Sequence, residues 1–100
     1  VLFAQGSAEL TDEARTQLAA LARRLAEDES IRVQLLAYAK DTGGGTSRAR
    51  RLSLSRALAV RSFLIERGIR STRMDVRALG DKAADGPPDR VDILPRRAQL

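Results

Sequence analysis

The hydrophobic pattern of the chain changes period several times, and this restricts the fold more than any other feature. Apolar residues after Thr11 recur at helical spacing, in a stripe formed by Ala14, Leu18, Leu21, Ala22 and Leu25. Residues 31–39 then alternate one by one, as in a strand, and a second helical pattern extends to about Arg67. A helix between two strands is the usual crossover between parallel neighbours, so the helices are expected on one face of the sheet.

These patterns predict an α+β fold, a two-layer sandwich with the order β-α-β-α-β-β. Thr11 is the expected N-cap of the first helix, Ser53 is the expected N-cap of the second, and Gly68 is placed to end the second helix. Pro95 should stop the last strand, which gives a domain of residues 1–95 and a tail of residues 96–100. The expected strands cover residues 1–4, 31–39, 74–78 and 90–93.

Composition excludes several function classes. The chain has 100 residues, enough for one domain, and a net charge of +5, which favours anionic partners. It contains no Cys and no His, so it has no disulfide framework, no thiolate metal site and none of the usual His-based catalytic sets. We therefore expect no enzyme, no metal and no cofactor. No apolar run is long enough for a membrane helix.

A Gly-rich and Arg-rich stretch, residues 41–57, is the candidate functional site. It follows the alternating run and leads into the second helix, whose first N–H groups and positive dipole end favour an anion. Arg56 lies one turn into the expected helix and is predicted to project from its flank, free to hold a carboxylate with its planar guanidinium. Asp41 stands at the start of the same loop.

Several phrases along the chain resemble one known family. They are VLFAQGSAELTDEA, IRVQLLAYAKDTGGG, LSLSRALAVRSFLIERGI, VRALGD and DRVDI. In this order they resemble the OmpA-like domain found at the C-terminal ends of OmpA, MotB and Pal, which binds peptidoglycan. The resemblance implies the OmpA-like arrangement, with helices on one face of a mixed sheet, and a non-catalytic cell-envelope function on the periplasmic side, associated with the outer membrane of Gram-negative bacteria.

The resemblance also implies a ligand and the residues that hold it. Family members bind the diaminopimelate of the peptidoglycan stem peptide, which is zwitterionic at its free end. Arg56 matches the family Arg that takes the carboxylate, and Asp41, 15 residues earlier, matches the family Asp that takes the ammonium. If Tyr38 is matched to the family's aromatic or His instead, the Asp position falls on Lys40. The other ligand-binding residues expected from the resemblance are Thr42, Gly43, Leu52 and Arg90.

Departures from the family pattern leave an alternative open. Arg48, Arg50 and Arg51 make the loop unusually basic, which would favour a more anionic ligand. The chain could then be an OmpA-like scaffold with a degenerate site that serves an acidic protein or an anionic envelope polymer. Nucleic acid is a third option suggested by charge alone, but few aromatics are present to stack on bases, so no nucleic-acid partner is predicted. The chain starts at Val1 without Met and resembles an excised fragment, so any signal peptide or membrane anchor is expected upstream of it.

Overall fold

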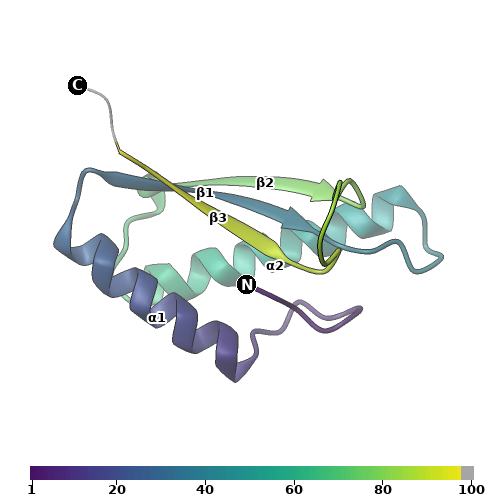
Figure 1. Ribbon diagram of the computed structural model, residues 1–100, viewed down its shortest axis with the longest axis horizontal. Helices are drawn as coiled ribbons and strands as arrows, with labels where there is room; N and C mark the ends of the chain where they lie inside the picture. Colours follow the sequence, from purple (N-terminus) through teal and green to yellow (C-terminus); the bar gives the residue numbers. More distant parts are fainter. Residues whose placement is uncertain (98–100) are drawn as a thin grey trace.

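The computed structural model describes residues 1–97 and has two layers, helices on one side and a sheet on the other (Figure 1). The elements, in chain order, are helix α1 (Asp12–Glu27), strand β1 (Ile31–Tyr38), helix α2 (Thr46–Glu66), a short 3-10 helix η1 (Ser71–Arg73), strand β2 (Met74–Gly80) and strand β3 (Val91–Arg97). The predicted α+β class is confirmed.

The three strands form one mixed sheet in the order β2-β1-β3. Strand β1 is parallel to β2, which follows it through the α2 crossover, and antiparallel to β3, which returns through a loop. Both helices cover the same face of the sheet (Figure 1). Leu18 and Leu25 of α1, Leu35 of β1 and Leu64 of α2 meet between the two layers and are almost completely buried, so the core is mainly aliphatic.

The first predicted strand is reduced to a single bridge. Leu2 pairs with Arg90 in an isolated antiparallel bridge. On either side of the bridge, Phe3 N donates to Asp89 O over 3.0 Å, and Val1 exchanges backbone hydrogen bonds with Val91. The chain then turns at Gly6, whose φ of 75° suits glycine, so pairing ends before a longer strand can form.

Helix α2 begins at Thr46, and the prediction that Ser53 is its N-cap is wrong. Gly45, with a φ of 87°, occupies the N-cap, and the Arg-rich run that follows is helical because Arg favours helices. Ser53 is instead buried two turns inside the helix. Its hydroxyl donates to Arg50 O over 2.7 Å and accepts from Gly80 N over 3.1 Å, which ties α2 to the end of β2.

The last strand passes through Pro95 to Arg97, so the predicted stop at Pro95 is wrong. Among the described strands β3 lies at the edge of the sheet, where a proline is tolerated because one side of the backbone needs no donor. Residues 96 and 97 of the predicted tail belong to β3, and residues 98–100 lie outside the described part of the chain. Neither α1 nor α2 is long and apolar enough to cross a membrane.

Candidate functional site

The loop between β1 and α2 is organised by Asp41. Its Oδ1 accepts hydrogen bonds from Gly43 N over 2.9 Å and from Gly45 N over 3.1 Å. These two glycines have φ values of 106° and 87°, which other residues adopt at a cost. Asp41 Oδ2 accepts no hydrogen bond from residues 1–97, so the exposed carboxylate keeps one oxygen available for a ligand.

A groove of about 360 Å³ runs between this loop and the first turns of α2. Asp41, Thr42 and Leu52, three of the predicted site residues, line it, whereas Gly43, Arg56 and Arg90 are not part of its wall. The other lining residues are Gly6, Lys40, Gly44, Gly45, Arg48, Ala49, Arg51 and Ser55. The loop that the sequence singled out therefore forms a concave site, although not with all of the predicted residues.

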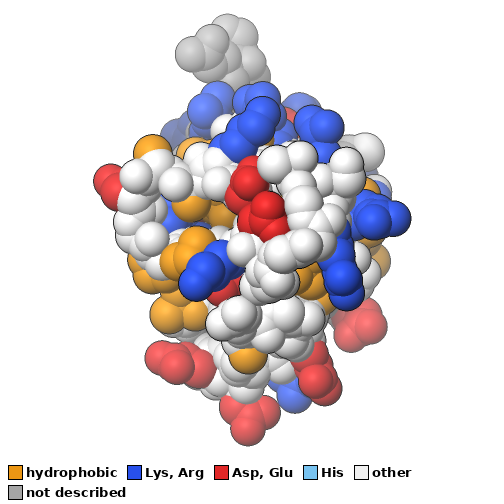
Figure 2. Space-filling model, turned by 90° about the vertical axis from the view of Figure 1, so that its right-hand side faces the viewer, with side chains coloured by type: hydrophobic (Ala, Val, Ile, Leu, Met, Phe, Trp, Pro, Cys, Tyr) orange, Lys and Arg blue, Asp and Glu red, His pale blue; other side chains and the backbone are white. Residues whose placement is uncertain are grey.

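The groove is predominantly cationic. Lys40, Arg48 and Arg51 are exposed along it, and none of them forms an ion pair with a residue in the described part of the chain. The stem of Arg48 lies over Gly44, and a Cβ at position 44 would displace Arg48 Cδ from this place. Figure 2 faces this end of the molecule and shows Lys and Arg side chains arranged around a small acidic patch.

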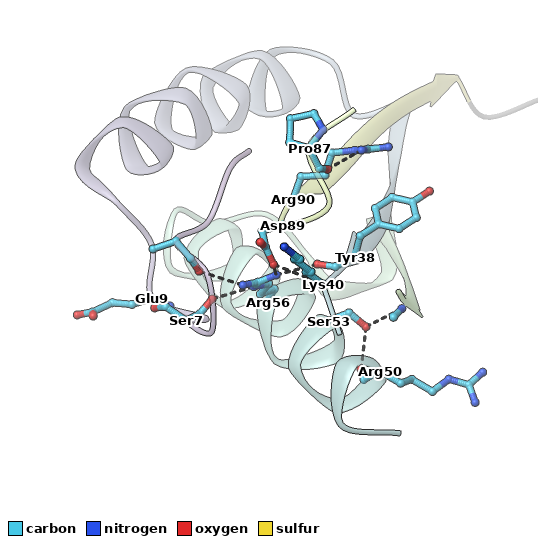
Figure 3. A network of polar contacts seen from close by, with 12 residues as sticks. Ser7, Glu9, Tyr38, Lys40, Arg50, Ser53, Arg56, Pro87, Asp89 and Arg90 are labelled. Carbon is cyan, nitrogen blue, oxygen red and sulfur yellow. Dashed lines mark hydrogen bonds and ion pairs between the residues drawn. The ribbon is translucent and has the colours of Figure 1, made fainter. Parts of the chain in front are cut away.

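Arg56 lies inside the protein, and the prediction that it projects freely from the helix flank is wrong. Its side chain has no exposed surface. Nε donates to Ser7 O over 2.8 Å, Nη2 to Ala4 O over 3.0 Å, and Nη1 to both Tyr38 O over 3.0 Å and Asp89 Oδ1 over 2.8 Å (Figure 3). Four of its five N–H groups are thus used by the protein itself.

Arg56 is buried because segments that are distant in the sequence pack around it. Position 56 shares the inward face of α2 with Ser53, Ala57 and Val60, and the guanidinium fits there because carbonyl groups of the N-terminal segment and β1 converge on it. The ring of Phe3 lies beneath it, 5.2 Å from the guanidinium carbon to the ring centroid. Helical periodicity alone cannot distinguish such a position from an exposed flank.

Asp89 is the important residue that sequence reasoning missed. Its Oδ1 accepts both from Arg56 Nη1 and from the backbone N–H of Lys40, over 2.8 and 3.1 Å. Burial opposes ionisation of this carboxyl, but the hydrogen bonds from Arg56 and Lys40 outweigh it and lower the pKa of Asp89. A guanidinium and a backbone N–H were expected to hold a ligand carboxylate, and here they hold one from the chain itself. The sequence offered one signal for Asp89, namely its position immediately before Arg90 in the phrase DRVDI, which resembles the family.

Arg90 lies apart from the groove and organises the loop before β3. Its guanidinium covers the Tyr38 ring at 4.7 Å from the centroid. Nε donates to Asp92 Oδ1 over 2.9 Å, and Nη1 donates to the carbonyl oxygens of Asp85 and Pro87 over 2.7 and 2.6 Å. These contacts hold the loop between β2 and β3, which we call the closing loop, against the start of β3.

A smaller hollow of about 230 Å³ lies on the other side of the start of α2, against the end of β2. Arg50 lines it together with Lys82, and Arg50 is absent from the wall of the larger groove. Neighbouring arginines of α2 therefore serve different surfaces. Within residues 1–97, no group of three or more acidic, His or Cys side chains is placed to hold a metal ion.

Comparisons with known proteins agree with this architecture. Residues 2–89 match the family model described as the OmpA family. The peptidoglycan-associated lipoprotein of Burkholderia pseudomallei superposes with a TM-score of 0.83 at 22% identity, covering 96% of this chain and 88% of that one. The C-terminal domain of Helicobacter pylori MotB superposes with a TM-score of 0.83 at 16% identity, covering 98% and 85%.

A third similar structure is the OmpA-like domain of FopA1 from Francisella tularensis, with a TM-score of 0.78 at 20% identity over 98% of this chain and 71% of that one. No curated protein sequence matches the chain at a significant level. These likenesses show the fold, and the family model covers most of the sequence. The chain belongs to the OmpA family, whose OmpA-like domains are non-catalytic binding domains, as the sequence predicted.

Proposed function

We propose that the chain is a cell-envelope domain that binds peptidoglycan through the diaminopimelate of the stem peptide. The observation that carries this proposal is the groove beside α2, where the available carboxylate oxygen of Asp41 stands among Lys40, Arg48 and Arg51. The free end of diaminopimelate is zwitterionic, and the stem peptide carries further carboxylates, so the ligand needs one anionic partner and several cationic ones. Hydrogen bonds between such charged groups are stronger than those between neutral groups. The similarity to a peptidoglycan-associated lipoprotein supports peptidoglycan as the polymer that is bound.

The roles follow from position. Asp41 Oδ2 receives the ammonium, and Lys40, Arg48 and Arg51 receive carboxylates. Thr42 and Leu52 line the groove and contact the peptide, while Gly43 contributes its left-handed turn. Since Arg56 and Arg90 are engaged with the protein, they position the site: Arg56 holds the β1 end of the loop through Tyr38 O, and Arg90 fixes the segment that carries Asp89.

This function places the chain on the periplasmic side of the bacterial envelope, where peptidoglycan is accessible. Association with the outer membrane in a full-length protein is part of the same proposal. The partner is then the cell wall itself, held by an exposed groove of modest size, so we expect micromolar rather than nanomolar affinity and a marked dependence on salt.

An NMR titration with a diaminopimelate-containing muropeptide tests the proposal. We expect saturable amide shifts in residues 40–55, around the groove, and little change in the hollow near Lys82. The Asp41→Asn variant should lose most of the affinity while its spectrum otherwise stays native. An unchanged spectrum of the wild-type protein at millimolar peptide would overturn the proposed ligand.

The pairing of Asp89 with Arg56 supports a second candidate function. Because Asp89 already occupies the guanidinium of Arg56, that guanidinium is not available to a ligand carboxylate, as expected of a degenerate diaminopimelate site. In this case the basic loop would serve an acidic protein or an anionic envelope polymer. This candidate predicts no response to the muropeptide. It also predicts binding to a model polyanion, such as a teichoic acid or polyglutamate, that is weakened by Arg51→Gln.

A further inference from the structure

We infer that the groove distinguishes stem peptides with free carboxylates from those in which these carboxylates are amidated, and that it favours the free form. The inference rests on the proposed function and adds a specificity to the same site. Amidation replaces one carboxylate oxygen by an NH₂ group. This leaves the shape of the ligand almost unchanged but removes a negative charge.

The first observation is that the charge of Arg56 is already compensated. Its Nη1 lies 2.8 Å from Asp89 Oδ1, the guanidinium is fully buried, and Asp89 also takes the backbone N–H of Lys40. No carboxylate of a ligand can use this guanidinium without displacing Asp89. Ligand carboxylates must therefore meet the cations at the groove surface.

The second observation is the imbalance of charge at that surface. Lys40, Arg48 and Arg51 face the groove, against one carboxylate, Asp41, whose Oδ1 is already engaged with the loop. A stem tripeptide attached to muramic acid carries one ammonium, on diaminopimelate, and carboxylates on both diaminopimelate and D-glutamate. One anionic and three cationic groups complement a ligand with this excess of carboxylates.

An amide at either carboxylate position meets the wrong partners. It replaces a charge-assisted acceptor by a neutral group whose NH₂ points a donor at the donors of Arg or Lys. Among the lining side chains, acceptor oxygens are offered by Asp41, which the ammonium occupies, by Thr42 and by Ser55. Ser55 Oγ donates its proton to Arg51 O, so Ser55, like Thr42, can offer the amide only a neutral hydrogen bond through its lone pairs. The amide therefore loses an attraction and gains little in return.

Calorimetric titration with matched muropeptides tests the inference. One peptide has free carboxylates, a second is amidated on diaminopimelate, and a third is also amidated on D-glutamate. We expect affinity to fall about fivefold for each amidation, the size of one exposed ion pair, and the salt dependence to weaken in step. The variant Arg51→Gln should bind the free peptide less tightly and discriminate less, whereas Arg50→Gln, one residue away but outside the groove, should discriminate like the wild type.

The outcomes distinguish failure of the proposed peptidoglycan binding from failure of the proposed selectivity. If none of the peptides binds, the proposed function fails. If free and amidated peptides bind equally well, or the amidated ones bind more tightly, the proposed function stands and the selectivity is refuted. Equal loss of discrimination in Arg50→Gln and Arg51→Gln would also refute it, because it would show a general effect of net charge rather than contacts in the groove.

Discussion

Arg56 Nη1 and Asp89 Oδ1 lie 2.8 Å apart at the point where the N-terminal segment, β1, α2 and the closing loop meet. The guanidinium is fully buried, while the Asp89 side chain keeps 15% of its surface exposed. This pair joins segments that are far apart in sequence, and its hydrogen bonds to Tyr38 O and from Lys40 N hold the β1 end of the loop that carries the groove. We therefore assign it a structural role beneath the candidate site.

Replacing Arg56 should destabilise the fold strongly. Arg56→Ala leaves a cavity, an uncompensated Asp89 and unpaired carbonyl oxygens, and removal of one partner of a buried pair typically costs about 3–5 kcal/mol. We expect the free energy of unfolding in urea to fall by about that amount. Arg50→Gln, on the exposed side of the same helix, should change it by less than ~0.5 kcal/mol. Equal, small effects of the two substitutions would contradict the structural role.

The stability contributed by Asp89 should depend on pH in a defined direction. Because the pKa of Asp89 is lowered in the folded protein, the unfolded chain binds a proton first as pH falls from neutrality. The contribution is fully present above the unfolded pKa, near the ordinary value of 3.8, and is lost as pH falls through the lower folded value.

The comparison of wild type with Asp89→Asn isolates this contribution. The difference in their free energies of unfolding should be constant above about pH 5 and should shrink as the pH falls below about 4. Asp28, whose pKa is also lowered, first by its hydrogen bonds from Ser30, is present in both proteins, and its effect cancels. A difference that grows on acidification would show that Asp89 is not held as a carboxylate.

Ser53 should matter for stability through one buried contact. In Ser53→Ala the backbone N–H of Gly80 loses its acceptor inside the protein, and an unsatisfied buried donor costs about 1–3 kcal/mol. Thermal unfolding should show the loss. The matched control is Ser55→Ala, whose exposed hydroxyl donates only to Arg51 O, and it should be nearly neutral.

Two substitutions at Asp41 separate its structural and binding roles. Asn retains an acceptor oxygen for the N–H groups of Gly43 and Gly45, so Asp41→Asn should keep the wild-type stability, whereas Asp41→Ala should lose about 1 kcal/mol, the usual worth of a capping side chain. Both should lose the ammonium contact and bind the muropeptide weakly. Normal binding by Asp41→Asn would show that Asp41 only shapes the loop.

The parts of the fold with local signals were predictable from the sequence. Thr11 caps α1 as expected, with Oγ1 accepting from Ala14 N over 3.0 Å, and Gly68 takes the left-handed conformation after α2 with a φ of 91°. Hydrophobic period distinguished helices from strands because each element buries one face. The Gly-rich and Arg-rich composition of residues 41–57 indicated the loop and helix that form the groove, and the family resemblance pointed to the same stretch.

What the sequence did not reveal depends on contacts between distant segments. Ser53 looks like a cap locally, but Gly80 of β2 decides its role. Arg56 looks exposed on a helical wheel, but carbonyl groups from residues 4, 7 and 38 bury it. Asp89 lies 33 residues from its partner, a separation at which no local pattern indicates a pair.

Binding to purified peptidoglycan sacculi tests the central claim most directly. The fraction of protein that sediments with sacculi should be compared between wild type, the groove variant Arg48→Gln/Arg51→Gln and the matched variant Arg23→Gln/Arg50→Gln, which loses the same charge elsewhere. We predict that the groove variant loses most of its binding, roughly tenfold or more for two charge-assisted contacts, while the matched variant binds like the wild type. Equal binding by the two variants, or none by the wild type, would contradict a cell-wall site in this groove.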